Sequence, residues 1–369
     1  MTDDETELAT TPLDALHRRL GARMVPFAGY AMPLQYSTGI IAEHLHCRAE
    51  AALFDVSHMG QASLLGEDAA AVLEHLVPGD ILGLKPGRQR YTLLTDDQGG
   101  ILDDLMVANL GDRLLLIVNA ARKAFDFAHI AAALPASVRL VPHPDHALLA
   151  LQGPASARVL ARLDPGVERI SFLEVAGRTL CGASAVITRS GYTGEDGFEI
   201  SIPAEAAERL ATALLAEPEV RPAGLGARDS LRLEAGLCLY GADIDTTTTP
   251  IEAGLGWTIG KRRRMTWDFS GATRIRAQQD DGPARLRVGI RPEGRAPARA
   301  GTPLLDEKGA EIGRVTSGCF SPSLNAPIAM GYVASAHAAD GTRLSALVRG
   351  KKLPSAIVPM PFVPHRYLR

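Results

Sequence analysis

The sequence predicts an α+β protein built from two or three domains. Its 369 residues exceed what a single hydrophobic core normally serves, and 46% of them are hydrophobic, enough to bury a core in each domain. The 36 glycines and 24 prolines indicate many turns. Helical segments alternate with short strand-like segments, so we expect hairpins and helices in one mixed architecture.

The first helix is expected at residues 14–20. Thr11 and Pro12 precede it, and proline is well tolerated where a helix begins. Residues 24–36 are rich in proline, glycine and aromatic side chains, which indicates an extended loop. Residues 38–52 then offer a second helix.

Strands and turns dominate the next part of the chain, which is the pattern of hairpins with interspersed helices. A buried apolar strand, ending in a turn, leads into a further helix. The expected strands are 53–56, 61–65, 89–95, 101–110, 114–118 and 148–154, and the expected helices are 68–76, 121–133 and 155–163.

Two strand-like segments, 178–189 and 198–202, are joined by a glycine-rich polar stretch at 190–197. Such a stretch is typical of a turn or short loop, and this one would display Glu195 and Asp196. Amphipathic helices are expected at 204–216 and 227–235.

Arg228 opens the second of these helices, where a cation opposes the helix dipole by about 0.3–1 kcal/mol. It could be held there for an anion, but an ordinary ion pair with Asp229 or Glu234 is the favoured interpretation.

Residues 278–283 are expected to form a linker. From 286 onward, short strands with Gly/Pro turns indicate a compact β-domain.

Bulk charge and cysteine usage argue against several classes of partner. Lys and Arg number 39 against 42 Asp and Glu, a net charge of −3, so nothing global favours nucleic acid or an anionic membrane. The four cysteines lack Cys-x-x-Cys spacing, which argues against a disulfide scaffold or a zinc site. The acidic start has no apolar signal core, and no apolar run reaches about 18 residues. We therefore expect a cytoplasmic protein.

Two adjacent acids, Asp103 and Asp104, stand in an apolar stretch directly after Gly99-Gly100. Side chains alternate along a strand, so the two acids should point to opposite faces and should not work as a pair. A buried, unpaired carboxylate costs several kcal/mol. A general base would justify that cost, because burial raises its pKa. A structural role, with one acid solvated and the other bonded to a backbone amide or an arginine, is an equal alternative.

Several segments together resemble the glycine cleavage system T-protein family, the aminomethyltransferases. The resemblance runs through almost the whole chain and includes the Gly-Gly-x-x-Asp-Asp motif. Any one motif is weak, but their number and order make the resemblance specific. The matching segments are 27–29, 53–59, 99–105, 147–154, 191–197, 227–237, 260–264 and 360–364.

This resemblance implies a three-domain cloverleaf around a central folate channel. Residues 1–55 and 141–264 would form a discontinuous folate-binding domain. Residues 56–140 would form a ferredoxin-like insert carrying the catalytic aspartate, and 265–369 a β-barrel-like domain.

The implied reaction passes the aminomethyl group on the lipoyl thiol of an H-protein to tetrahydrofolate. Its products are 5,10-methylenetetrahydrofolate, ammonia and dihydrolipoyl H-protein. Tetrahydrofolate is the cosubstrate, the lipoylated H-protein is a transient partner, and the step needs no metal or redox cofactor. Neither nucleic acid nor membrane is an expected partner.

By the same resemblance, Asp104 is the catalytic carboxylate, acting on the reacting N5 and the iminium through its charge or as a proton acceptor. Glu195 matches the glutamate that accepts hydrogen bonds from the pterin. The remaining implied site residues are Arg228 and Tyr367 as folate contacts, and Tyr91, Met59, Val107 and Tyr192 as channel lining.

Some features leave alternatives open. The end of the chain, His365 to Arg369, is shorter and more basic than is usual in the family, which weakens the match at Tyr367. The basic run Lys261-Arg262-Arg263-Arg264 could meet an acidic H-protein or could serve the framework. The alternative activity is a folate-dependent demethylase of the same fold. A non-catalytic folate-binding scaffold is a third possibility, against which the acid at 104 argues.

Overall fold

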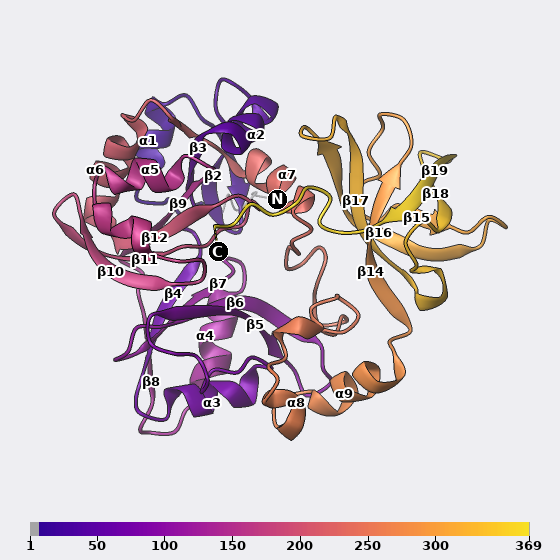
Figure 1. Cartoon of the computed structure of the whole chain (residues 1–369), viewed down its shortest axis with the longest axis horizontal. Helices are drawn as coiled ribbons and strands as arrows, with labels where there is room; N and C mark the ends of the chain where they lie inside the picture. The colour runs from indigo at the N-terminus through magenta and orange to yellow at the C-terminus, as the bar shows by residue number, and fades with distance from the viewer. Residues whose placement is uncertain (1–6, 369) are drawn as a thin grey trace, which may run out of the picture. The chain divides into compact units, whose positions relative to one another are not determined.

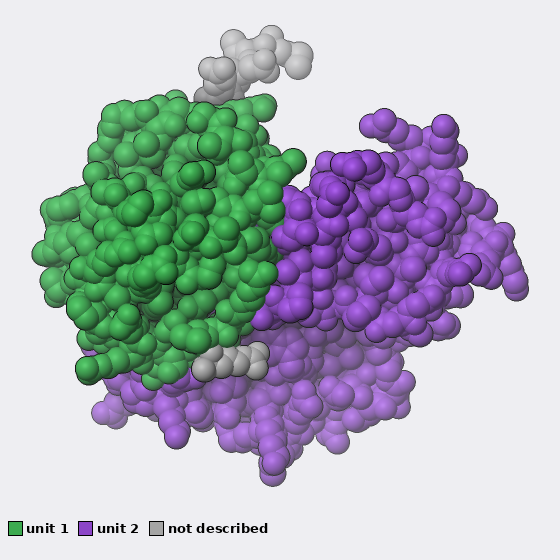
Figure 2. Space-filling model, turned by 45° about the horizontal axis from the view of Figure 1, so that its top comes forward, with its two compact units in different colours: residues 1–61, 142–229, 366–369 green, residues 62–141, 230–365 purple. Residues whose placement is uncertain are grey.

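The computed structural model describes residues 7–368; the acidic start, residues 1–6, and Arg369 lie outside the described residues. The chain divides into two compact units, coloured separately in Figure 2. Unit 1 comprises residues 1–61, 142–229 and 366–369, and unit 2 comprises 62–141 and 230–365. No helix within the described range is long and apolar enough to span a membrane.

Unit 1 is built on a six-stranded sheet of order β10-β11-β12-β9-β3-β13 (Figure 1). Its short edge strand β13 pairs parallel to β3, and the other pairs are antiparallel. Apolar side chains of the sheet and of α1, α5 and α6 share one core, including Leu151, Leu160 and Leu210. The elements are α1 (Asp14–Arg19), α2 (Ile40–Ala49), β3 (Ala51–Asp55), β9 (His146–Gln152), α5 (Ser156–Ala161), η1 (Pro165–Arg169), β10 (Val175–Leu180), β11 (Ala183–Thr188), β12 (Gly197–Pro203), α6 (Ala204–Leu215) and β13 (Val220–Pro222).

A two-stranded hairpin, β1 (Arg23–Phe27) and β2 (Tyr30–Gln35), occupies the segment expected to be an extended loop. The loop prediction was therefore wrong. Ala28 and Gly29 make the turn, both with positive φ (49° and 81°), as a two-residue hairpin turn requires. Pro26 and Pro33 had argued against strands. In a two-stranded ribbon every strand is an edge strand, so a proline can sit there without breaking the ladder.

Unit 2 contains most of a five-stranded sheet of order β5-β6-β7-β4-β8. The succession β4-α3-β6-β7-α4-β8 is the β-α-β-β-α-β pattern of a ferredoxin-like fold, with β5 added at the edge. Leu73 of α3 and Ile130 of α4 pack in one cluster with Leu105 and Leu116 of the sheet. The bounds are β4 (Gly60–Leu65), α3 (Ala69–Leu76), β5 (Arg88–Thr95), β6 (Ile101–Asn109), β7 (Leu114–Val118), α4 (Lys123–Ala132) and β8 (Arg139–Pro142).

The C-terminal part of unit 2 is a closed six-stranded barrel, in the order β14-β17-β16-β15-β18-β19. Pairing of β14 with β19, for example Ile290 opposite Ile357, closes it, and both side chains are buried in its core. The mixed fold with a C-terminal barrel is thus confirmed. The strands are β14 (Arg285–Pro292), β15 (Pro303–Leu305), β16 (Glu311–Ser321), β17 (Ala326–Ala334), β18 (Arg343–Val348) and β19 (Lys351–Val358).

The predicted linker at 278–283 was wrong, because helix α9 (Ala272–Asp281) runs through it. The helix ends at Gly282, whose φ of 85° suits glycine. Its polar residues form tertiary contacts: Gln278 Nε2 donates to Glu252 Oε1 at 2.9 Å. The remaining helices are α7 (Leu225–Glu234), η2 (Gly256–Thr258), α8 (Arg263–Thr266) and η3 (Ser335–His337).

Candidate active site

Asp104 lies half-buried on β6, opposite Leu93 of β5. The hydroxyl of Tyr91, also on β5, donates to Asp104 Oδ2 at 2.9 Å. The Tyr91 ring stacks on Trp257, with 5.6 Å between ring centroids, and Trp257 itself is 64% exposed. The predicted residues Tyr91 and Asp104 are therefore in direct contact within unit 2.

Asn119 joins the two adjacent acids. Its Nδ2 donates to Asp103 Oδ1 at 2.9 Å and to Asp104 Oδ1 at 2.7 Å, and its backbone N–H donates to Asp103 Oδ2 at 3.1 Å. The prediction that the acids could not act as a pair was wrong. Asn119 lies just past the end of β7, where the ladder no longer confines its side chain to one face, and its amide reaches both carboxylates.

The surroundings of Asp104 make it basic for a carboxylate. Burial, followed by the neighbouring charge of Asp103, raises the pKa of Asp104 to about 7. Hydrogen bonds from Tyr91 and Asn119 act in the opposite direction. Both forms of the acid are therefore populated near neutral pH, which is the condition for efficient proton transfer.

Glu195 lies buried in unit 1, at the end of the glycine-rich loop. Arg48 NH1 donates to Glu195 Oε1 at 2.9 Å, and Arg366 NH1 lies 3.5 Å from the same oxygen. The other oxygen, Oε2, is buried with no hydrogen-bond partner in the described part of the chain. One oxygen is thus neutralised by arginine while the second remains an open acceptor.

The loop was expected to display its two acids, and this was wrong, because both Glu195 and Asp196 are buried. Asp196 accepts two hydrogen bonds from Arg189, Nε at 3.0 Å and NH2 at 2.6 Å. Sequence reasoning missed Arg48 because it is 147 positions from Glu195. Arg366 is brought there by the C-terminal segment, whose backbone N–H donates to Gly194 O at 2.8 Å.

Arg228 of α7 lies over the ring of Tyr192, with its guanidinium carbon 4.9 Å from the ring centroid. Burial lowers the pKa of Arg228. Its NH1 is buried without a partner, and no carboxylate pairs with Arg228 among the residues that the structure describes. The ion pair expected at first was wrong. The open NH1 suits an acceptor from outside the chain.

The other predicted site residues differ in their surroundings. The ring of Tyr367 stacks on Phe172 in unit 1, with centroids 4.4 Å apart and an interplanar angle of 12°. Met59 is half-buried, shortly after β3. Val107 is fully buried in the hydrophobic cluster that contains Leu105 and Leu116, so its side chain belongs to a core.

The basic run at 261–264 is mostly engaged within unit 2. Arg262 pairs with Glu74 and Asp80, and Arg263 is buried against Asp268. Arg264 donates to two backbone carbonyls. These contacts support the framework interpretation for the three arginines.

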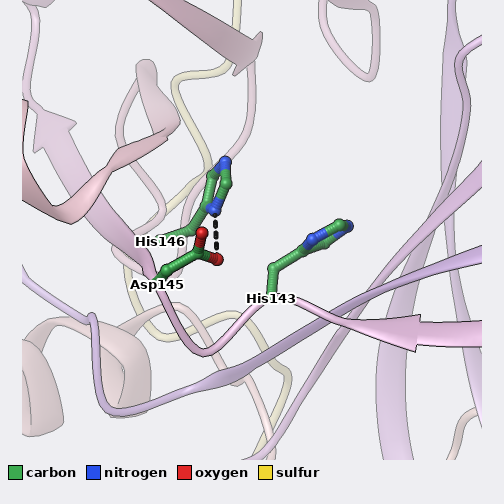
Figure 3. A group of neighbouring side chains, drawn as sticks. All are labelled: His143, Asp145 and His146. Carbon is green, nitrogen blue, oxygen red and sulfur yellow. Dashed lines mark hydrogen bonds and ion pairs between the residues drawn. The ribbon is translucent and has the colours of Figure 1, made fainter.

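A small polar cluster lies at the turn before β9 and on the first residue of that strand. His143, Asp145 and His146 have side-chain ligand atoms within 4.8 Å of one another. Figure 3 shows His146 Nδ1 facing Asp145 Oδ1, at 3.1 Å, while the ring of His143 extends away from them. Asp145 is exposed, and none of the predicted site residues belongs to this turn.

Known families and proteins match almost the whole chain. The family described as "GCVT N-terminal domain" matches residues 13–263, and the "Glycine cleavage T-protein C-terminal barrel domain" matches 285–364. Mitochondrial aminomethyltransferases from Gallus gallus and Homo sapiens are 49% and 47% identical. Both alignments cover 98% of this chain, with 94% of the chicken protein and 91% of the human one.

A crystal structure of glycine cleavage system aminomethyltransferase T from Bartonella henselae aligns with a TM-score of 0.93 and 44% identity. It covers 98% of this chain and 100% of its own. The fold and the matching relatives define a transferase of mixed α/β architecture, and the chain belongs to the glycine cleavage T-protein family. Its activity is that of an aminomethyltransferase of the glycine cleavage system.

Proposed function

We propose that this chain transfers the one-carbon unit of an aminomethyl-lipoyl H-protein to tetrahydrofolate. Ammonia, 5,10-methylenetetrahydrofolate and dihydrolipoyl H-protein are the products. The observation that carries the proposal is Asp104, a carboxylate with a pKa of about 7 held by Tyr91 and Asn119 on β6. An acid in that state suits a reaction that passes through a cationic iminium and moves protons between nitrogens.

Two open polar atoms of unit 1 support pterin binding. Glu195 Oε2 is a buried acceptor that suits the N–H groups of a pterin ring, and Arg228 NH1 is a buried donor that suits an anionic or carbonyl oxygen. Leaving such atoms without a partner costs free energy, which a ligand with the complementary groups recovers. We therefore assign Glu195 and Arg228 to tetrahydrofolate, with Tyr192 supporting Arg228.

Asp104 acts on the reacting carbon in this proposal. N5 and N10 of tetrahydrofolate each form a bond to that carbon, while its bonds to the lipoyl sulfur and to the amino nitrogen break. The protons displaced from N5 and N10 end on the thiol and on ammonia. The ionised carboxylate stabilises the cationic carbon between these steps, and it can accept a proton as the nitrogen attacks.

The assay that tests this function supplies aminomethylated H-protein and tetrahydrofolate, and measures ammonia and methylenetetrahydrofolate. We expect both products from the unmodified chain. Methyl transfer from another donor with no product here would instead support a folate-dependent demethylase. That alternative is not favoured, because relatives at 44–49% identity are named aminomethyltransferases.

Asp104→Asn tests the role of the carboxylate itself. The amide keeps the size of the side chain but carries no charge and accepts no proton, so we expect turnover to fall by about 10²–10⁴-fold. Binding of tetrahydrofolate, measured by calorimetry, should persist. Near-normal turnover in this variant would remove Asp104 from the mechanism.

A further inference from the structure

Gln152 is a fully buried polar residue that the proposed reaction does not use. It ends β9 and lies opposite Gly197, the first residue of β12. Its amide nitrogen lies within 3.4 Å of three backbone oxygens, the closest being Ser190 O at 2.9 Å. Its amide oxygen, Oε1, accepts from Thr193 Oγ1 at 2.8 Å. Both ends of the amide therefore bond to the glycine-rich loop, residues 190–197.

Two glycines make room for this amide. A Cβ at Gly191 would lie 1.7 Å from Gln152 Oε1, and one at Gly197 would lie 2.6 Å from Gln152 Nε2. Neither glycine has a positive φ, so these positions use the missing side chain and not the freedom of the backbone. The glycine-rich loop thus packs directly against the Gln152 amide.

The amide sets the direction of the Thr193 hydroxyl. A carboxamide nitrogen donates and a backbone oxygen accepts, so the nitrogen faces the three backbone oxygens and Oε1 faces Thr193. The hydroxyl must then donate its one proton to Gln152, which leaves its lone pairs for a donor. That donor is the backbone N–H of Glu195, at 3.2 Å. Gln152, Thr193 and the Glu195 backbone form one directed chain of hydrogen bonds.

The same segment is held from a second direction. Arg48 NH1 donates to Thr193 O at 2.7 Å and to Glu195 Oε1 at 2.9 Å. Thr193 and Glu195 are at most 1% exposed, so solvent does not substitute for these bonds. The backbone of Glu195 and one of its carboxylate oxygens are both fixed, and the direction of the open oxygen, Oε2, follows from them.

We propose that Gln152 and Thr193 are positioning residues for tetrahydrofolate binding. Together they fix the backbone at Glu195, and thereby the direction of Oε2, before the ligand arrives. A preorganised acceptor binds more tightly, because the group needs no ordering when the ligand binds. This inference rests on the role proposed above for Glu195. Gln152 and Thr193 act on the ligand only through that residue.

Thr193→Val breaks the chain of hydrogen bonds at its middle. Valine has nearly the shape of threonine without the hydroxyl, so Gln152 Oε1 and the Glu195 N–H both lose a partner. We expect the dissociation constant of tetrahydrofolate, measured by calorimetry, to rise by about 5–20-fold. Turnover at saturating tetrahydrofolate should fall by less than this factor, because the contacts of Asp104 are not altered.

Thr193→Ser is the conservative variant. Serine keeps the hydroxyl, so the dissociation constant should stay within about threefold of the unmodified chain. Ile202→Val is the matched control for stability. Ile202 lies on β12, fully buried in the core of unit 1, and losing one methyl group should lower the melting temperature without changing the dissociation constant.

Gln152→Met tests the first member of the chain. Methionine is similar in length and has no donor for Ser190 O, so the dissociation constant should rise at least as much as in Thr193→Val. The double variant Gln152→Met/Thr193→Val should bind no worse than Gln152→Met, because the two residues act in series. A Gln152→Met chain that binds as tightly as the unmodified chain would overturn the role of Gln152.

A further double variant tests whether the effect passes through Glu195. Adding Thr193→Val to Glu195→Ala should not weaken binding any further, because no carboxylate remains to be oriented. A merely structural role would predict the same loss with or without Glu195. Equal losses in the two backgrounds would therefore contradict the inference.

A second readout needs no ligand and no activity. Hydrogen exchange of the backbone amides in 190–197, measured on the full chain by mass spectrometry, should be faster in Thr193→Val than in Thr193→Ser. Equal exchange in these two variants, or an unchanged dissociation constant in Thr193→Val, would overturn the inference. If Glu195→Ala still weakens binding, the proposed folate site survives that result, so the two failures are distinguishable.

Discussion

At the scale of single residues, Glu195 shows how one carboxylate can serve both stability and binding. Its Oε1 meets Arg48 and Arg366, and its Oε2 stays open. A buried carboxylate is costly unless charged or polar partners surround it. Arg48 and Arg366 supply these partners at one oxygen, and the second oxygen is left as an acceptor.

Glu195→Ala should weaken tetrahydrofolate binding. Losing a charge-assisted acceptor costs about 1.5–3 kcal/mol, or roughly 10–100-fold in the dissociation constant. Calorimetric titration of the purified chain with tetrahydrofolate measures the dissociation constant. Asp280→Asn, an exposed change on α9, is the control and should leave the constant unchanged. An unaltered constant in Glu195→Ala would remove this residue from the binding site.

The pH dependence of turnover should follow Asp104. Its pKa is about 7, and the ionised form is the active one, so turnover should be low below that pH and rise through it. Single-turnover rates, measured from pH 5.5 to 9 at saturating substrate concentrations, follow this rise in activity with pH. A profile that stays flat across neutrality would contradict the assignment of Asp104.

Asn119 could have been found from the sequence. Asn109 pairs with Leu114 across the short turn between β6 and β7, and Leu105 pairs with Val118. Continuing that register by one step sets Asn119 opposite Asp104. Arg48 carries no such signal, because its approach to Glu195 depends on contacts between segments far apart in the chain.

At the scale of elements, the start of β6 decides where the paired acids lie. Gly100 precedes Ile101, whose N–H donates to the backbone oxygens of Thr248 at 3.0 Å and Asp245 at 3.2 Å. A Cβ at Gly100 would lie 2.1 Å from the backbone oxygen of Thr246. Only glycine allows this close approach, so the Gly-Gly pair serves the placement of the strand as well as its turn.

Gly100→Ala should lower stability and turnover together. The methyl group forces β6 away from the Thr246 segment, at a cost of about 1–3 kcal/mol, and displaces Asp103 and Asp104 with it. Gly177→Ala is the control, because a Cβ there meets nothing within 4 Å. Its unfolding midpoint and its turnover should stay close to those of the unmodified chain. Equal behaviour of the two variants would contradict the crowding argument.

The single strand expected at 178–189 was wrong, because a turn at 181–182 divides it into the end of β10 and β11, which pair as a hairpin. Two other elements that sequence reasoning mistook share a cause. The hairpin β1–β2 contains prolines that usually signal loops, and the end of α9 is as polar as a linker. In both cases local composition resembles a connection. The hairpin is ordered by the ladder between its own strands, and α9 by tertiary contacts such as that of Gln278 with Glu252. The apolar strands β6, β7 and β9 were predicted correctly, because a buried strand shows its burial in its own residues.

At the scale of the whole molecule, Arg232 of α7 forms a buried ion pair with Asp243 and a hydrogen bond to the barrel, all within unit 2. Arg232 NH1 donates to Asp243 Oδ2 at 2.7 Å, and its NH2 donates to Ser317 Oγ of β16 at 2.9 Å. Both charged side chains are at most 3% exposed. Thr316 donates to the other oxygen of Asp243, so the acid is fully engaged.

Arg232→Met should destabilise the protein by about 3–5 kcal/mol, because it leaves Asp243 buried without its cation. The midpoint of chemical unfolding measures the loss. The double variant Arg232→Met/Asp243→Leu should recover part of it, since no unpaired charge remains. A single variant as stable as the unmodified chain would show that Asp243 is satisfied by its other donors.

The succession of parts was foreseen chiefly from the order of the family's motifs. Alternation and turn signals indicated strands, but closure of the barrel depends on the pairing of its first and last strands, which no local pattern specifies. The three-domain division stays a prediction beside the two compact units that the structure defines.

Of the two carboxylate oxygens of Glu195, Oε1 is bonded to arginine and Oε2 has no partner among the described residues. This difference has a consequence for inhibitor design. A molecule designed for this part of unit 1 should aim a hydrogen-bond donor at Oε2, where nothing competes, and should leave Oε1 to the arginines. An otherwise identical compound that presents a carbonyl or ring nitrogen acceptor there would set two lone pairs against each other. Affinity should then separate the two compounds sharply, although their shapes are the same.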